Sequence, residues 1–151
     1  MPQFTKEILT DTVSRSVVKF TWGGGSTNSS YGLTGSVMPS ELYGYGGSAS
    51  GVTNIDLSVA KVFWSLPYTS TPPSIECAWQ QTGSVTGTPF LYLNGSGFVN
   101  YNAEGMSIPN TLTGASRTNG VTFRNVGTFG TNDTATFIFE LDKTRGFTIT
   151  G

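Results

Sequence analysis

Residues 134–141 read Thr-Ala-Thr-Phe-Ile-Phe-Glu-Leu, and this stretch indicates the fold class of the chain most directly. Its apolar side chains recur at every second position, so that one face carries Ala135, Phe137, Phe139 and Leu141. An amphipathic helix would repeat its apolar side chains every three to four residues, whereas a period of two is that of a half-buried strand. The stretch therefore predicts a strand with an aromatic face against a core.

The same alternation recurs along the chain. Residues 15–22 place Val18, Phe20 and Trp22 on one face, and residues 74–80 do so with Ile75, Cys77 and Trp79. Further short strands are predicted at 90–93, 98–101 and 121–126. Between residues 55 and 66 the apolar parity changes at Ala60 and Lys61, which predicts a bulge or a bend. Phe129, in the connector 127–133, is expected to plug one end of the core.

Turn signals separate these strands, and helical spacing is never sustained beyond one turn near residues 39–43. The segment Asn94-Gly95-Ser96-Gly97 predicts a hairpin. A chain of 151 residues is long enough for one stable core. We expect a single all-β domain, an antiparallel β-sandwich or jelly roll. The expected core comprises Val18, Phe20, Trp22, Val62, Trp64, Ile75, Cys77, Trp79, Leu91, Phe98, Phe123, Phe137, Phe139 and Leu141.

Composition excludes several function classes. The chain has no histidine and only 11% charged residues, yet 13% of it is aromatic. Without histidine it lacks the commonest general base and metal ligand. Eight scattered Lys and Arg residues and a net charge of −1 give no basic field for nucleic acid. No apolar run approaches the roughly 20 residues that cross a bilayer, and no signal peptide is visible. We expect no cofactor, no nucleic acid and no membrane partner.

Individual reactive groups favour structural roles. Cys77 lies among apolar side chains, which predicts a buried thiol rather than a nucleophile. Glu76 and Glu140 are the candidates for a glycosidase-like carboxylate pair, but both fall on the outer parity of their strands, which favours solvated positions. Asn132 with Asp133, and Asn54 with Asp56, are more typical of turn capping than of a calcium site. We therefore expect no catalytic residue and no metal site.

Two segments are expected to meet a partner. Residues 1–14 are predicted as a polar arm, either laid across a neighbouring subunit or disordered, and residues 15–151 as the domain. Residues 23–51 form a long Gly-, Ser- and Tyr-rich insertion in that domain. A loop ordered against a partner explains its tyrosines, with a flexible linker and packing within the chain as alternatives. The candidate partner-binding residues are Tyr31, Leu42, Tyr43 and Tyr45 of the loop, with Phe4 and Ile8 of the arm.

Several segments together resemble a known kind of protein. A polar leader precedes the residues Arg15-Ser16-Val17-Val18-Lys19-Phe20-Thr21, and Lys61-Val62-Phe63-Trp64 follows. The turn Leu93-Asn94-Gly95-Ser96-Gly97 comes later, and Phe137-Ile138-Phe139-Glu140-Leu141-Asp142-Lys143 closes the pattern. In this order the segments, over nearly the whole chain, resemble small virion proteins of tailed bacteriophages, particularly those of marine and cyanobacterial hosts. The resemblance implies an all-β part of the head shell or tail, with no catalytic residues.

Three functions follow as hypotheses. The first is a capsid decoration, or cement, protein that binds the major capsid protein and stabilises the head. The second is a tail fibre or receptor-binding module whose tyrosines, including Tyr101, stack on host glycans. The third and least favoured is a glycan hydrolase. The first two imply a virion protein assembled in the host cytoplasm, as a homo-oligomer such as a trimer.

Overall fold

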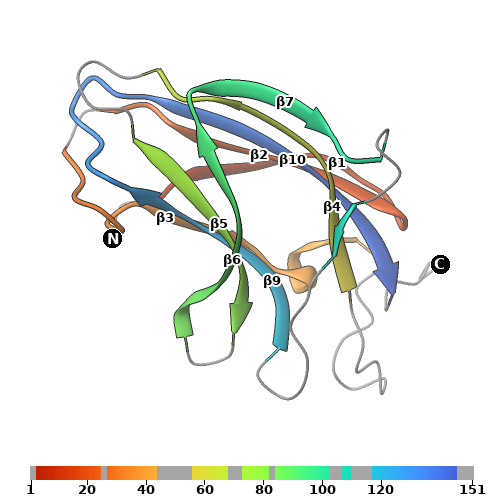
Figure 1. Cartoon of the computed structure of the whole chain (residues 1–151). Helices are drawn as coiled ribbons and strands as arrows, with labels where there is room; N and C mark the ends of the chain where they lie inside the picture. The colour runs from red at the N-terminus through yellow and green to blue at the C-terminus, as the bar shows by residue number, and fades with distance from the viewer. Residues whose placement is uncertain are drawn as a thin grey trace.

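A computed structural model of the chain describes residues 3–24, 27–43, 56–67, 73–81, 84–102, 107–109 and 117–145. Two antiparallel sheets form the two layers of the molecule (Figure 1), which confirms the predicted all-β sandwich. One sheet has the order β1-β2-β10-β4-β7, with β8 also paired to β4, and the other has the order β3-β9-β5-β6. Among the described residues, no helix is long and apolar enough to cross a membrane.

Each alternating stretch of the sequence lies in a strand, but the strands predicted at 90–93 and 121–126 begin earlier, at Ser84 and Arg117. The six-stranded sheet contains β1 (Thr5–Asp11), β2 (Arg15–Trp22), β4 (Asp56–Ser65), β7 (Ser96–Asn100), β8 (Ile108–Pro109) and β10 (Ala135–Arg145). The four-stranded sheet contains β3 (Thr34–Val37), β5 (Ser74–Gln81), β6 (Ser84–Asn94) and β9 (Arg117–Val126). One turn of 3-10 helix, η1, spans Pro39–Glu41. The sequence pattern missed β1, β3 and β8, which are short or lie at sheet edges and do not alternate cleanly.

An aromatic cluster fills the space between the sheets. The ring of Phe123 lies 4.6 Å from Phe20, 5.1 Å from Phe137 and 4.9 Å from Phe139, measured between centroids. Aromatic pairs at this spacing contribute beyond the area that they bury. Phe129 is also fully buried, as the sequence predicts. This cluster joins β2 and β10 of one sheet to β9 of the other.

The predicted core is confirmed apart from its margins. Trp22, Trp64 and Leu91 are only partly buried and pack against it. The predicted place of Phe98 in the core is wrong, because 61% of its surface is exposed. Pairing with β4 sets the parity of β7, placing Val99 opposite the buried Val62 and Phe98 opposite the outward-facing Phe63.

The parity change in β4 is a bulge, as predicted. Lys61 pairs with Glu140 and Val59 pairs with Leu141, so Ala60 has no counterpart on β10. Because of this extra residue, both Val59 and Val62 face the core and are fully buried. Turn capping by Asp133 is also seen, since its carboxylate accepts a hydrogen bond from the Gly130 amide at 2.6 Å.

The N-terminal segment differs from the expected arm. Residues 5–11 form β1, which pairs with β2 in the chain's own sheet. Phe4, just before β1, is buried with its ring 5.0 Å from that of Phe137. Its amide donates a hydrogen bond to the carbonyl of Thr34. This part of the leader therefore completes the sandwich instead of leaving it.

The predicted hairpin at Gly95 is a corner instead. Gly95 has the positive φ expected of the turn, +63°. The strands on either side do not lie in one sheet, because β6 pairs with β5 whereas β7 pairs with β4. The turn thus carries the chain from one layer of the sandwich to the other. A local turn signal gives the position of such a corner but not the partners of the strands that it joins.

The described part of the 23–51 insertion packs on its own domain. Strand β3 pairs with β9, and Asn28 forms a bridge with Phe129. Leu33 and Leu42 are buried in the core. Packing within the chain, one of the three alternatives, thus describes residues 27–43.

Candidate binding surfaces

Four side chains form a continuous row across the outer face of the four-stranded sheet: Tyr31, Arg124, Glu76 and Tyr92. Strand pairing places Arg124 opposite Glu76, and Glu76 opposite Tyr92. Arg124 Nε donates to Glu76 Oε1 at 2.8 Å, and the Tyr92 hydroxyl donates to Glu76 Oε2 at 3.3 Å. The guanidinium carbon of Arg124 lies 3.9 Å from the centre of the Tyr31 ring. We call these four residues the tyrosine row.

The charges of the tyrosine row cancel. Glu76 is buried beneath its neighbours, so the solvated position predicted for it is wrong. Arg124 supplies the one positive charge that balances it. The pKa of the Tyr92 hydroxyl is raised by desolvation and by the charge and hydrogen bond of Glu76, which keeps it a neutral donor. The row therefore offers two rings to solvent, with a neutralised and mostly covered ion pair between them.

Tyr31 is held in an unusual backbone conformation. Its φ of +66° is the only positive value among the non-glycine residues described, and this left-handed region costs an L-residue about 1–2 kcal/mol. The Tyr31 amide donates to the Asn125 carbonyl at 2.8 Å. The buried Asn125 side chain accepts from the Leu33 amide and donates to the carbonyls of Ser29 and Gly127. Asn125 thus fixes the loop that presents the Tyr31 ring.

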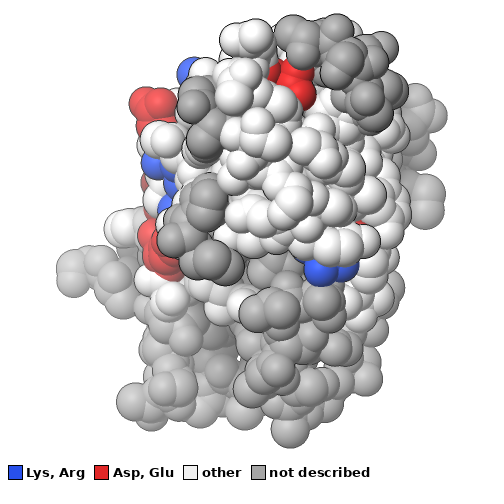
Figure 2. Space-filling view, turned by 90° about the vertical axis from the view of Figure 1, so that its left-hand side faces the viewer, with Lys and Arg blue, Asp and Glu red and all other residues white. Residues whose placement is uncertain are grey.

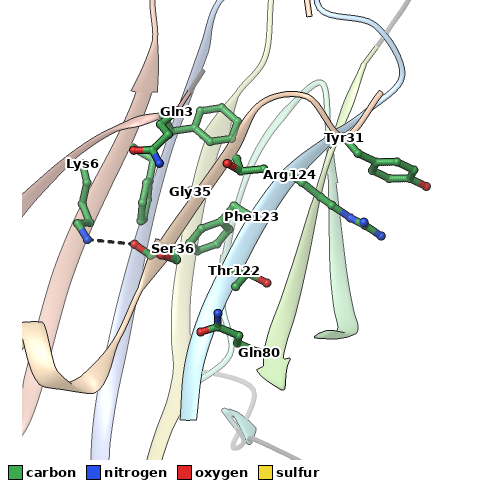
Figure 3. Close-up of a pocket in the computed structure, with 12 residues that line it drawn as sticks. Gln3, Lys6, Tyr31, Gly35, Ser36, Gln80, Thr122, Phe123 and Arg124 are labelled. Atoms are coloured by element: carbon green, nitrogen blue, oxygen red, sulfur yellow. Dashed lines mark hydrogen bonds between the residues drawn. The ribbon is translucent and has the colours of Figure 1, made fainter. Parts of the chain in front are cut away.

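A groove of about 520 Å³ adjoins the tyrosine row. Figure 3 shows Gln3 and Lys6 on one side of β3 and Tyr31, Thr122 and Arg124 on the other. Between them β3 contributes Thr34, Gly35 and Ser36. Gly35 pairs with the inward-facing Phe123, and a Cβ there would lie 3.2 Å from the buried ring of Phe4. The groove therefore runs over a strand of small residues whose glycine packs closely on the core.

The outer face of the six-stranded sheet carries a different feature. Ile138 of β10 pairs with Phe63 of β4, which pairs with Phe98 of β7. The exposed fractions of Phe63 and Phe98 are 42% and 61%. Such cross-strand neighbours lie within contact of each other. We call Ile138, Phe63 and Phe98 the phenylalanine strip.

Two groups of charges lie beside the phenylalanine strip: Lys19, which is opposite Ile138 on β2, and the ion-paired residues around Glu140. Glu140 forms ion pairs with Arg15 at 2.8 Å and with Lys61 at 3.5 Å. On the other side of the strip the paired residues all carry hydroxyl groups: Thr5, Thr21, Thr136, Ser65 and Ser96. Figure 2 shows another side of the molecule, where the middle of the described surface is uncharged and the charged groups lie toward its margins.

The residues predicted to bind a partner are dispersed. Tyr31, Tyr43 and Ile8 are exposed, whereas Phe4 and Leu42 are buried and have no surface to offer a partner. Tyr45 lies outside the described residues. Tyr31 belongs to the tyrosine row, while Tyr43 lies at the opposite end of the 27–43 segment.

Tyr43 is part of a polar cluster that fastens this segment to the sheet. The ammonium group of Lys143 donates to Asp11 Oδ1 and to the Tyr43 carbonyl, both at 2.7 Å. Asp11 Oδ2 accepts from the Tyr43 amide at 2.8 Å. Burial acts to raise the pKa of Asp11, but hydrogen bonds from Lys143, Ser16 and Tyr43 hold it below its ordinary value. We call Lys143, Asp11 and the Tyr43 backbone the lysine clasp.

Neither reactive chemistry nor metal binding is evident elsewhere in the described parts of the chain. Burial, with the nearby charge of Glu76, raises the pKa of the Cys77 thiol well above its ordinary value, as the predicted buried role requires. In the described residues no group of three or more histidine, cysteine, aspartate or glutamate side chains is placed to hold a metal ion.

Sequence reasoning missed Arg124 and Tyr92 of the tyrosine row, and it missed Phe63 and Phe98 as surface residues. Alternation gave the parity of Tyr92 and Phe63 but not which strands lie beside them. The signal that could have found the phenylalanine strip is Phe63 itself, which has the outward parity in a strand of inward-facing Val62 and Trp64.

No protein-family model and no curated protein matches the sequence. Among solved structures, a chain of the acidic stable capsid of Helicobacter pylori bacteriophage KHP30 aligns with 93% of this chain and 95% of its own length. Its sequence identity is 11% and its TM-score 0.40. A chain of the native virion of Kashmir bee virus aligns with 97% of this chain and 74% of its own, at 11% identity and a TM-score of 0.37. The fold assignment itself rests on the strand pairing.

Proposed function

We propose that the chain is a non-enzymatic structural protein of a virus particle, a decoration protein that binds the major capsid protein and stabilises the head shell. The phenylalanine strip supports this proposal. Two Phe side chains with 42% and 61% of their surface exposed lie side by side on one face. Aromatic side chains of this kind are the usual anchors of protein interfaces.

The surroundings of the strip fit a protein partner. Glu140 beside it is already paired with Arg15 and Lys61, so covering that side of the face leaves its carboxylate with counterions. The threonine and serine residues on the other side of the strip provide small polar groups of the kind found at interface rims. The partner that we propose is the repeating surface of the assembled shell, where many weak contacts add up through avidity.

A binding assay with empty heads tests the proposal. Purified protein is mixed with expanded empty heads of the phage that encodes the chain. The heads are sedimented and the bound protein is quantified. We expect saturable binding that a Phe63→Ser, Phe98→Ser double variant weakens tenfold or more, since interface anchors contribute about 2 kcal/mol or more each. Folding should be unaffected, because both rings lie on the surface.

Tyr92→Ala is the matched control, since it removes an exposed ring of similar size from the opposite face. Wild-type protein that fails to bind heads would contradict the proposal, as would a double variant that binds as well as Tyr92→Ala does. Removing residues 1–14 is not a clean test, because it takes away β1 and the buried Phe4.

A tail component is the alternative, and its support is the pair of exposed rings in the tyrosine row. Gold labelling of the chain in intact particles, viewed by electron microscopy, distinguishes head from tail directly. The same preparation gives the copy number, and the mass of the purified protein in solution tests the expected homo-oligomer.

A further inference from the structure

We infer that the tyrosine row and the adjoining groove form a binding site for neutral saccharides. This site goes beyond the proposed shell-binding role, because it lies on the outer face of the other sheet. The inference rests on three features of that face: exposed rings, hydrogen-bonding groups fixed between them, and a backbone that holds them in place.

The rings supply the stacking surfaces. Tyr31 and Tyr92 have 48% and 50% of their surface exposed. The apolar face of a pyranose ring packs against an aromatic ring, and tyrosine combines such a face with a polar tip. Tyr92 stands two strands from Arg124, about 10 Å by ordinary strand spacing. With Tyr31 at its far end, the row has room for a pair of linked sugar rings.

The polar groups between the rings match sugar hydroxyls. Arg124 uses Nε for Glu76, and its terminal N–H groups donate no hydrogen bond to any other residue that the structure describes. Arginine carries five N–H donors in a fixed plane, and the buried Glu76 carboxylate, which accepts from Arg124 and Tyr92, holds that plane in position. A few oriented polar groups among aromatic walls are typical of small-molecule sites. The groove over β3 extends the site with Ser36 and Thr122.

The charge balance of the site selects neutral ligands. Arg124 is already neutralised by the buried Glu76 carboxylate, so an acidic sugar on its terminal N–H groups would add a second negative charge that no further cation balances. Lys6, the other cation lining the groove, is itself paired with Glu41. No unpaired positive charge among the described residues of the groove is therefore present to attract a carboxylate or sulfate.

The site is organised before the ligand arrives. Asn125 fixes the loop of Tyr31 with three hydrogen bonds, and Arg124 and Glu76 hold each other in place. Strained backbone that persists in a fold often marks a functional position. A rigid site avoids part of the entropy cost of binding.

The experiment uses a panel of hexasaccharides. The neutral members are built from glucose, mannose, galactose and N-acetylglucosamine, and the acidic members are oligogalacturonate and oligosialic acid. Binding to the full chain is measured by saturation-transfer NMR and by calorimetry. We expect at least one neutral probe to bind with a Kd of about 1 mM or below, and Tyr31→Ala and Tyr92→Ala each to weaken it about tenfold. Tyr31→Phe, which keeps the ring, should retain binding.

Tyr43→Ala is the matched control, because Tyr43 is equally exposed, at 45%, but lies outside the row. Unchanged binding of the variants to empty heads, with unchanged thermal melting, shows that they fold. The inference is overturned if no neutral probe binds, if the acidic probes bind more tightly, or if Tyr43→Ala weakens binding as much as Tyr31→Ala. None of these results bears on the phenylalanine strip, so failure here is separate from failure of the proposed function.

Discussion

The two long edges of the sandwich are closed in different ways. At the β6–β7 edge the chain itself crosses between the sheets through Gly95, and nearby residues brace the corner: the Leu66 amide donates to the Gly95 carbonyl at 2.7 Å and Trp64 Nε1 donates to the Asn94 carbonyl at 2.8 Å. At the β1–β3 edge, no short turn between strands is seen in the part of the chain that the structure describes. Side chains of segments far apart in the sequence close that edge, among them Phe4, Lys6 and Lys143.

The two edges therefore differ in how far apart in the sequence their contacting residues lie. The corner turns within one short stretch of backbone, which Trp64 braces from 30 positions away, whereas the β1–β3 edge consists of contacts across 30 to 132 positions, as between Lys6 and Ser36 and between Lys143 and Asp11. Damage to a local corner can be absorbed by a small backbone shift. Damage to the other edge should expose core and leave buried polar groups without partners, so the larger effects are expected there.

Replacing Phe4 should give the largest effect. Phe4→Ala removes a buried ring that packs on Phe137, and truncations of this kind cost about 3–5 kcal/mol of unfolding free energy. Urea denaturation at neutral pH measures the loss. Phe98→Ala, which truncates the same residue type at the opposite edge, should cost less than about 1 kcal/mol because Phe98 is mostly exposed. Equal losses in the two variants would refute the idea that β1 and its leader belong to the fold.

The sequence predicted one edge much better than the other for this reason. The neighbouring Asn and Gly residues predicted the turn at Gly95. In residues 1–14 nothing alternates, because β1 is an edge strand whose inward side is shared between Phe4, Lys6 and the half-covered Ile8. Lys6 points toward the sheet edge and donates to the Ser36 carbonyl, a contact that no pattern of neighbouring residues reveals. An inward-pointing charge is a common way of protecting an edge strand from further pairing.

The tyrosine row likewise depends on contacts between distant parts of the sequence. Tyr31 was found from composition alone, as a tyrosine in a Gly-rich segment. Arg124, Glu76 and Tyr92 come from three other parts of the chain and meet only because β9, β5 and β6 are neighbours. Strand order is set by the total burial of both sheets, so no local pattern contains it. For most residues the sequence predicted which face of the sheet the side chain occupies. It did not predict which residues lie opposite on the neighbouring strands.

Breaking the lysine clasp should give the next largest effect. Lys143→Met leaves the Asp11 carboxylate without its counterion and takes a donor from the Tyr43 carbonyl. Losing one partner of a largely buried pair costs about 3 kcal/mol. Lys19→Met is the control, because Lys19 lies on the outer face of β2 and its loss should cost about 0.5 kcal/mol or less. Similar urea midpoints for the two variants would show that the clasp does not secure this edge.

The clasp also predicts how stability depends on pH. The pKa of Asp11 is lower in the folded chain than in the unfolded one, so its contribution is complete above the unfolded value and is lost as the pH falls through the folded one. Wild-type unfolding free energy should therefore decline below about pH 4. In Asp11→Asn this component should be absent. Urea titrations from pH 7 to pH 3 measure both curves, and parallel curves would exclude Asp11 as a source of the decline.

The corner at Gly95 should give the smallest effect, because only the backbone of one residue is at stake. A Cβ at Gly95 would meet no atom within 4 Å, so Gly95→Ala tests conformation without a steric clash. At a φ of +63° an alanine should cost about 1–2 kcal/mol. Gly95→Asn should recover much of that loss, because asparagine tolerates the left-handed region. Thermal melting of the three proteins measures the order, with glycine highest and alanine lowest. An alanine variant as stable as the wild type would mean that the corner relaxes freely, and the two edges would then differ even more than their contacts indicate.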